Sequence, residues 1–458
     1  MEKRDTIAAL ATGKGNAALA IIRISGKKSF EIIQKLVKPE KRFINALPKE
    51  TGIYKFTNFK TQKVIDEVMA IKYLSPKSYT GEDMVEIICH GGEIVINEII
   101  STLIEEKISV AERGEFTKRA YLNGKMELLK AESIDKIITS NSKKQHEIAL
   151  NAFQGNTFKK IIEWKQYIKK IIMELEARIE FPEENDIINI SGHWMENIRT
   201  INESIKKEIL NREKIKYLEN GLSIPIVGIT NAGKSTLFNM LLGFERAIVH
   251  HEEGTTRDTI SEEILIAGEK IKIFDTAGLH ETENNVEKIG IKKSFELMEN
   301  SQIIIWVTPR NKEMTEFEKS ILKNKGKTKI IGIISKKDLS GNKEKQELLS
   351  RLEIENIIVS LLDHLEKDAI VSFLKEIIEK EINQNKTENS MIFSKRQEEI
   401  FYRMKEKTED IVGKGSFLGE EIVSKLLRDL LDEIAELVGE TTTDDILNSI
   451  FDNFCIGK

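Results

Sequence analysis

The chain has 458 residues, of which 40% are hydrophobic and 32% are charged, with a formal net charge of −5. This length exceeds what a single hydrophobic core supports and predicts two to four domains. The composition excludes a disordered or fibrous chain. The negative charge argues against binding nucleic acid by bulk charge, so an RNA partner would need a local basic patch or a second protein.

Cysteine usage and hydrophobic patterning indicate the compartment. The two cysteines, Cys89 and Cys455, are too few for a disulfide framework, which indicates a reducing environment. The segment Met1–Gly13 lacks the apolar core of a signal peptide, and no apolar run is long enough to span a membrane. We therefore expect a cytoplasmic protein without a membrane partner.

The first 120 residues mix short apolar runs with helical spacing. Ala18–Ile24 and Val85–Cys89 are predicted strands, and Ser29–Val37 and Glu93–Glu106 are predicted helices. We expect an amino-terminal α+β domain over residues 1–120.

Long helical periodicity with few turn residues then follows. It covers Glu127–Ala152, Phe158–Ile179 and Met195–Tyr217, and predicts the first part of a helical domain over residues 121–218. Helical patterns return in residues 381–458, at Glu398–Ile411 and Glu420–Val438, and Thr443 can cap a last helix. This is the second part of the same domain.

Residues 219–380 alternate apolar strand candidates with helical segments. Such alternation predicts a mostly parallel sheet covered by helices on both faces, inserted between the two parts of the helical domain. Ala267-Gly268 predicts a hairpin and thus one antiparallel pair. The strand candidates are Ile224–Ile229, Glu262–Ile266, Lys270–Phe274, Ile303–Val307, Lys329–Ile334 and Asn356–Val359.

A phosphate-binding loop follows the first of these strands. Gly228 and Gly233-Lys234-Ser235 have the spacing G-x-x-x-x-G-K-S, placed between an apolar strand and a helix over Ser235–Leu242. Inward-turned backbone N–H groups and the lysine bind phosphates, while the serine hydroxyl binds magnesium. We expect GTP contacts from Asn231, Ala232, Gly233, Lys234, Ser235 and Thr236.

Two further segments lie near the expected phosphates. Asp275-Thr276-Ala277-Gly278 ends a second apolar strand, where the aspartate can hold magnesium through water and the glycine N–H can meet the terminal phosphate. Gly254–Asp258 lies between the loop and this strand, and a threonine in it can complete the magnesium shell. The alternative for Gly254–Asp258 is a polar surface loop.

Ser335-Lys336-Lys337-Asp338 follows a further strand and predicts the choice of base. The Asp338 carboxylate can accept two hydrogen bonds from guanine, and adenine has no such donor pair. Asn or Thr is usual at the first position, and the shorter reach of Ser335 predicts weaker base affinity. Ser360, after Val359, predicts the second base-side loop.

The residues for hydrolysis are less evident. Leu279 stands where many GTPases place a water-orienting Gln, so catalytic charge must come from elsewhere. An Asn231 amide oxygen can help to bind a monovalent cation such as K⁺ beside the phosphates. A local hydrogen bond within the loop is the alternative for Asn231.

These motifs resemble a known family. Phe454-Cys-Ile-Gly-Lys458, Thr255-Thr-Arg-Asp258 and Asp275-Thr-Ala-Gly-Leu279 are similar to the MnmE (TrmE) family of tRNA modification GTPases, and the resemblance runs from Asp5 to Lys458. It implies an amino-terminal folate-binding and dimerisation domain, a helical domain in two segments and an inserted Ras-like P-loop G domain.

The resemblance also implies an activity and partners. Members hydrolyse GTP with Mg²⁺ and K⁺ as homodimers and act with the flavoprotein MnmG (GidA) on tRNA. Together they install a 5-carboxymethylaminomethyl-type group on the wobble uridine. The one-carbon unit comes from a tetrahydrofolate derivative of 5-formyl or 5,10-methylene type.

Site residues carry over from the family to the matching positions here. The resemblance makes Asn231, His250, Glu252 and Thr255 the K⁺ ligands, Ser235 and Thr256 the Mg²⁺ ligands, and Glu287 the residue that orients water. Folate contacts fall on Arg23, Glu82, Lys125 and Lys458. Cys455 serves the modification chemistry or packs the carboxyl tail.

Two other hypotheses remain open from the sequence. The first is a potassium-dependent switch GTPase in ribosome assembly, although such proteins usually carry a basic appendage and residues 379–458 hold 18 acidic against 11 basic residues. The second is a scaffold that only binds nucleotide, against which the intact Lys234, Ser235, Thr256 and Asp275 argue.

Overall fold

The computed structural model contains two compact units. It describes residues 6–13, 15–140, 143–181, 194–219, 222–242, 260–266, 269–275, 297–298, 301, 303–323, 328–340, 344–384, 390–415 and 418–458. The first unit comprises Met1–Thr139, Ala149–Lys206 and Met391–Lys458, and the second comprises Ser140–Ile148 and Lys207–Ser390. The predicted domain boundaries at residues 120, 218 and 380 stay predictions.

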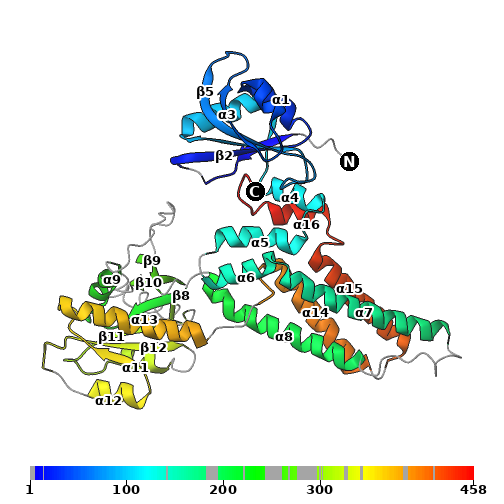
Figure 1. Ribbon diagram of the computed structural model, residues 1–458. Helices are drawn as coiled ribbons and strands as arrows, with labels where there is room; N and C mark the ends of the chain where they lie inside the picture. Colours follow the sequence, from blue (N-terminus) through cyan, green and yellow to red (C-terminus); the bar gives the residue numbers. More distant parts are fainter. Residues whose placement is uncertain are drawn as a thin grey trace. The chain divides into compact units, whose positions relative to one another are not determined.

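The amino-terminal part of the first unit is an α+β fold around one sheet (Figure 1). Seven strands lie in the order β3-β4-β5-β6-β2-β1-β7, antiparallel except for the parallel pair β1 and β7. The strands are β1 (Ile7–Leu10), β2 (Ala17–Ser25), β3 (Val37–Lys38), β4 (Thr51–Thr57), β5 (Val64–Tyr73), β6 (Met84–Gly91) and β7 (Ser109–Val110).

Alternation along β2 explains how this sheet forms its core. Ala20, Ile22 and Ile24 are buried on one face, whereas Leu19 is exposed on the other. Helices α1 (Ser29–Leu36) and α3 (Glu93–Glu105) contribute to the same apolar cluster, and α2 (Glu40–Asn45) adds Phe43. The predicted strands and helices of this region are confirmed.

The rest of the first unit is helical. The predicted helical stretch Glu127–Ala152 forms two helices, α5 (Leu128–Thr139) and α6 (Lys143–Phe153). The other helices are α4 (Glu115–Leu122), α7 (Asn156–Glu180), α8 (Trp194–Glu219), α14 (Lys395–Lys414), α15 (Glu420–Val438) and α16 (Asp444–Phe451). Helices α6 and α8 begin in one unit and end in the other.

Sequence-distant segments are tied together in this bundle. Arg396, at the start of α14, donates to both carboxylate oxygens of Glu132 in α5, at 2.7 and 3.1 Å. The same guanidinium donates to the carbonyls of Glu436 and Leu437, which end α15. Thr443 caps α16 by accepting from the Ile446 N–H, as predicted.

The second unit is a doubly covered sheet. Six strands lie in the order β13-β12-β11-β8-β10-β9, all parallel except the β10–β9 pair. The strands, β8 (Leu222–Val227), β9 (Ile260–Ile266), β10 (Glu269–Asp275), β11 (Ile303–Pro309), β12 (Lys329–Ser335) and β13 (Asn356–Ile358), confirm the six predicted ones. Ala267-Gly268 lies outside the described residues, but Ile266 and Glu269 beside it are paired.

Strand β11 shows why helices cover both faces. Ile305 and Val307 belong to one apolar cluster with residues of α9 (Lys234–Leu242) and α13 (Lys367–Gln384). Ile304 and Trp306 belong to another, with residues of α11 (Glu316–Lys323) and α12 (Glu344–Arg351). The strand is thus buried on both sides, as parallel strands usually are, and Figure 1 shows α13 and α12 on opposite sides of the sheet.

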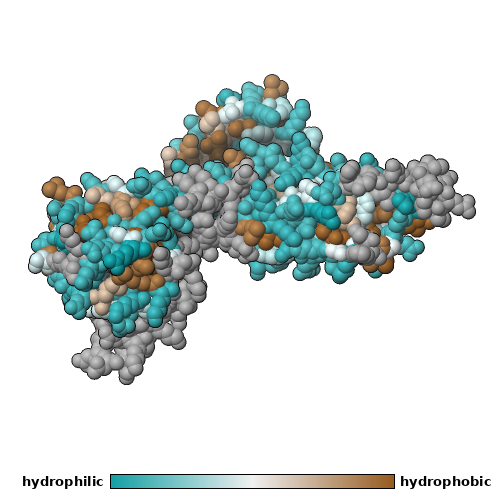
Figure 2. Space-filling model, turned by 90° about the horizontal axis from the view of Figure 1, so that it is seen from below, coloured by the Kyte–Doolittle hydropathy of each residue, from teal (hydrophilic) through white to brown (hydrophobic). Residues whose placement is uncertain are grey.

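The surface gives one more general observation. On the face in Figure 2 the described surface is mostly hydrophilic, and hydrophobic side chains form separate patches. Within the described parts of the chain, every helix is too short or too polar to cross a membrane.

Candidate functional site

The phosphate loop connects the carboxyl end of β8 to the first turn of α9. A Cβ at Gly228 would lie 2.1 Å from the Val307 carbonyl oxygen, so only glycine fits beside β11. Asn231 has φ 61°, a left-handed conformation that asparagine tolerates better than most residues. The loop therefore adopts a fixed turn that the sequence specifies.

Lys234 is held over this loop. Its side chain is buried, and Nζ donates to the carbonyls of Gly228 at 2.9 Å and Ile229 at 3.0 Å. Ser235 and Thr236 follow on the first turn of α9 and are exposed. A helix amino terminus with an ammonium beside it favours bound phosphate.

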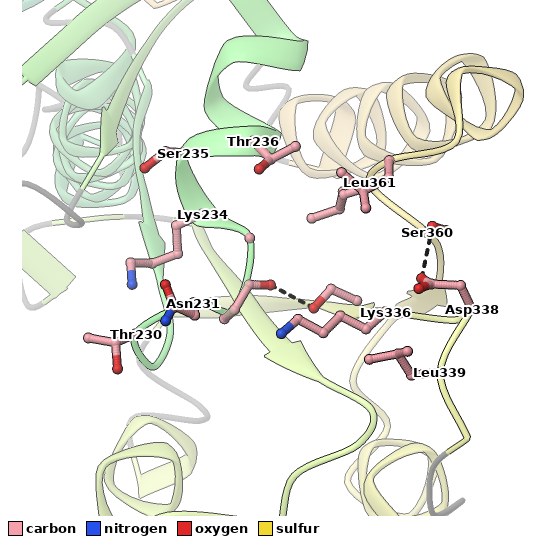
Figure 3. Close-up of a pocket in the computed structure, with 14 residues that line it drawn as sticks. Thr230, Asn231, Lys234, Ser235, Thr236, Lys336, Asp338, Leu339, Ser360 and Leu361 are labelled. Atoms are coloured by element: carbon pink, nitrogen blue, oxygen red, sulfur yellow. Dashed lines mark hydrogen bonds between the residues drawn. The ribbon is translucent and has the colours of Figure 1, made fainter.

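The loop forms one side of a cavity of about 500 Å³. Three segments line it: residues 230–236, residues within 335–339 after β12, and residues 360–362 after β13. In Figure 3, Lys234, Ser235 and Thr236 lie on one side, and Asp338, Leu339 and Ser360 lie on the other. The predicted phosphate and base residues that the structure describes are thus brought together.

The base-side loops are bonded to each other and to the phosphate loop. Ser335 is buried, and its Oγ donates to the Ala232 carbonyl oxygen at 2.6 Å. Ser360 Oγ donates to Asp338 Oδ1 at 3.0 Å (Figure 3). The serine at position 335 therefore links the base side to the phosphate loop.

Sequence reasoning missed Glu366, whose carboxylate contacts both base-side loops. Oε1 accepts from Lys337 Nζ at 2.6 Å, and Oε2 accepts from the Ser360 N–H at 2.7 Å. The hydrogen bond from Lys337, and after it the hydrogen bond from the Ser360 N–H, lowers the pKa of the Glu366 carboxyl. No spacing or motif marks this glutamate in the sequence, because Lys337 is 29 positions away.

Several predicted residues lie outside the described part of the chain. These are His250, Glu252, Thr255, Thr256, Thr276, Ala277, Gly278 and Glu287. Asp275 ends β10, where its backbone pairs with Ile226 in β8, just before the phosphate loop begins. The roles predicted for the residues outside the described part, and for Asp275, therefore stay predictions.

A second cluster forms where the carboxyl tail meets the amino-terminal sheet. Arg23 Nε donates to Glu86 Oε1 at 3.0 Å, and its Nη1 donates to the Gly457 carbonyl oxygen at 3.3 Å. The Phe116 N–H donates to the Lys458 carbonyl oxygen at 3.2 Å. Burial, and next the positive charge of Arg23, lower the pKa of the Lys458 ammonium.

Glu82 lies in the same region with a partner that the sequence did not reveal. Its Oε2 accepts from Ser25 Oγ at 2.8 Å and from Arg119 Nη1 at 3.2 Å. Arg119 also donates to Glu115, one turn earlier in α4. Ser25 is two residues after Arg23 on β2, so Glu82 and Arg23 are anchored to neighbouring positions of one strand.

The other two residues of this cluster are exposed. Lys125 Nζ donates to the Pro76 carbonyl oxygen at 2.7 Å, which holds it against the segment that carries Glu82. Cys455 is a free thiol in the tail, three residues before Lys458. Cations and a carboxylate are side chains that can bind an anionic ligand with a polar ring edge.

The fold and the phosphate loop define a P-loop nucleotide-binding protein. Family models match residues 6–125 as the GTP-binding protein TrmE N-terminus and residues 128–455 as the MnmE helical domain. The chain therefore belongs to the family of tRNA modification GTPases called MnmE, which confirms the resemblance.

Similar proteins cover nearly the whole chain. The tRNA modification GTPase MnmE of Clostridioides difficile is 35% identical over 99% of this chain and 99% of its own. That of Fervidobacterium nodosum is 36% identical over 99% of this chain and 98% of its own, and that of Mycoplasma mobile is 35% identical over 99% and 100%.

Proposed function

We propose that the chain hydrolyses GTP as part of tRNA modification at the wobble uridine. The observation that supports hydrolysis is the pocket that joins Lys234 and Ser235 on its phosphate side to Asp338 and Ser360 on its base side. Family membership supports the tRNA substrate. Because the substrate is tRNA, we place the reaction in the cytoplasm.

The residues fit a magnesium–guanine nucleotide. Backbone N–H groups of the loop and the Lys234 ammonium would hold the phosphates, and the exposed Ser235 hydroxyl would hold Mg²⁺. Asp338 would accept from the guanine edge. The metal would neutralise charge that develops on the transferred phosphoryl group.

Turnover of GTP and ATP by the full chain tests this activity. We expect GTP to be hydrolysed in preference, and Lys234→Met to lower the rate by roughly 100-fold or more, because it removes a charge from the phosphates. Equal turnover of ATP, or full activity of Lys234→Met, would contradict the proposal.

We further propose K⁺ as the catalytic cation, a homodimer as the active form and a flavoprotein of the MnmG type as partner. The support is the family assignment together with Asn231, whose left-handed conformation leaves it exposed beside the phosphate side of the pocket. Leu279 in the usual place of a glutamine agrees with a mechanism that uses a cation instead. The water-orienting role stays with Glu287 as a proposal.

A tetrahydrofolate derivative is proposed for the cluster at the carboxyl tail. Glu82 would accept from the pterin edge, and Arg23, Lys125 and Lys458 would meet the glutamate tail. The group would supply the one-carbon unit. Calorimetry with a reduced folate should show binding to the full chain that weakens when Lys458 is deleted; undiminished binding would remove the tail from the site.

The ribosome-assembly alternative has less support. It would use the nucleotide pocket but needs neither the cluster at Arg23 nor the carboxyl tail. The family models match residues 6–125, which include Arg23, and residues 128–455, which include the carboxyl tail except its last three residues. We therefore retain tRNA modification as the proposed function.

A further inference from the structure

One carboxylate lies between the two base-side loops of the nucleotide pocket. Glu366 ends the short helix η3 (His364–Glu366), which follows the loop after β13. One of its oxygens accepts from Lys337 Nζ at 2.6 Å and the other from the Ser360 N–H at 2.7 Å. Because Lys337 belongs to the loop after β12, this single side chain bridges the two loops.

Other hydrogen bonds between the described residues of these loops also hold them together. Ser360 Oγ donates to Asp338, and the Lys337 N–H donates to the Val359 carbonyl oxygen at 3.2 Å. Strand β13 has only three residues and lies at the edge of the sheet. Asp338 is exposed, so its position depends on the loop contacts and not on burial in the core.

We propose that Glu366 is a positioning residue for base recognition. By holding Lys337 and the Ser360 N–H, it sets the spacing of the two loops and orients Asp338 and Ser360 toward a guanine edge. Glu366 is not among the residues that line the pocket, so it acts through the two loops and not by contact with the nucleotide. This inference rests on the proposed function.

The conservative variant Glu366→Gln separates the two bonds. A glutamine has one acceptor oxygen and one donor amide, so it can satisfy either Lys337 or the Ser360 N–H but not both. Glu366→Ala removes both bonds. Asp363→Asn is the matched control, because it makes the same change three residues earlier, on a side chain that accepts only from the Leu365 N–H among the contacts described.

The experiment measures GDP and IDP binding by the full chain with Mg²⁺. IDP lacks the 2-amino group that Asp338 would accept from, so the ratio of the two affinities reports the orientation of Asp338. We expect Glu366→Gln to weaken GDP binding roughly tenfold and IDP binding less, so that the ratio falls roughly threefold. Asp363→Asn should keep both affinities.

Each outcome has a distinct meaning. A folded Glu366→Gln with an unchanged ratio, or with equal losses for GDP and IDP, would overturn the positioning role. If that variant does not fold, Lys337→Met tests the same bridge from an exposed side chain, and a retained ratio there would overturn it too. A wild-type chain that does not prefer GDP to IDP would contradict the proposed function itself.

Discussion

At the residue scale, the nucleotide pocket depends on a hydroxyl that is fully enclosed. Ser335 Oγ donates to the Ala232 carbonyl oxygen in the phosphate loop and is only 1% exposed. Ser335→Ala would leave that carbonyl without this donor, at a cost of about 1 kcal/mol, which is roughly fivefold in affinity. We expect GDP binding to weaken by this factor.

The matched control for this change is Ser340→Ala. Ser340 is exposed and lies five positions along the same loop. Fluorescence titration with a labelled GDP measures both variants. Equal affinities for Ser335→Ala and the wild type would show that the bond between the two loops does not matter for the nucleotide.

The two thiols should differ strongly in reactivity. Burial raises the pKa of Cys89 to about 11, whereas Cys455 is exposed. Since the thiolate is the reactive form, at pH 8 on the order of one Cys89 thiol in a thousand is ionised. We expect iodoacetamide to label Cys455 in the native protein, and Cys89 only as the pH approaches 11 or after unfolding.

Mass spectrometry of the labelled peptides checks this difference. Cys455→Ser should show no labelling at pH 8 while native, and one label in denaturant. Rapid native labelling of Cys89 would contradict the burial of β6 in the sheet.

At the element scale, a buried ionic network joins β11, α11 and α12. Lys345 Nζ donates to Thr308 Oγ1 at 2.7 Å and lies 3.4 Å from Glu318 Oε1. Glu318 is completely buried, and desolvation lowers the pKa of Lys345. Lys345 in α12 is 27 residues from Glu318 in α11, and the pair holds both helices against Thr308 of β11.

Lys345→Met should therefore lower the free energy of unfolding by about 3–5 kcal/mol, because it leaves the Glu318 charge buried without its cation. Lys319→Met is the control, since Lys319 pairs with Glu316 on the exposed side of α11, and exposed ion pairs contribute little to stability. Urea unfolding measures the stability of both variants. Equal small losses would contradict the buried ion pair of Lys345 and Glu318.

The carboxyl tail provides a second element-scale prediction. Gly457 has φ 92°, and a Cβ there would lie 2.0 Å from the Leu10 carbonyl oxygen. Gly457→Ala should displace the tail from Arg23 and lower folate affinity roughly tenfold, since charge-assisted contacts are lost. GDP affinity should not change.

Gly413→Ala serves as control, because nothing lies within 4 Å of a Cβ at that position. Calorimetry with a reduced folate and with GDP separates the two sites. Unchanged folate binding by Gly457→Ala would place the ligand away from the tail.

How well the sequence predicted each element depends on its burial. Ile303–Val307 is a continuous apolar run because β11 is buried on both faces, and β12 is predicted from a similar run. Strand β5 was missed because Asp66, Glu67 and Lys72 interrupt its pattern, since much of it is exposed. Long-range partners such as Arg119 for Glu82 leave no trace in local spacing.

The phosphate loop could be proposed from the sequence because its signal is local. Gly228, Gly233 and Lys234 follow a spacing that phosphate chemistry dictates locally. Glu366 was missed because its position relative to Ser360 and Lys337 depends on how η3 and two loops fold together. The bond from Ser335 to Ala232 could not be predicted, because only the packed sheet brings the two residues together.

At the scale of the whole molecule, the chain carries two chemically different sites in two units. The second unit holds the nucleotide pocket, and the first holds the cluster of Arg23, Glu82 and Lys458. The proposed coupling of GTP hydrolysis to one-carbon transfer would use both. The proposed cation dependence is the property that distinguishes it from a glutamine-dependent switch.

GTP turnover by the full chain in potassium compared with sodium, at equal ionic strength, tests the central claim most directly. The variant Lys234→Met serves as the control for background turnover. The account predicts clear stimulation by potassium and none for the variant. Turnover that is equal in both salts, or absent from the wild type in potassium, would contradict a potassium-dependent GTP hydrolase.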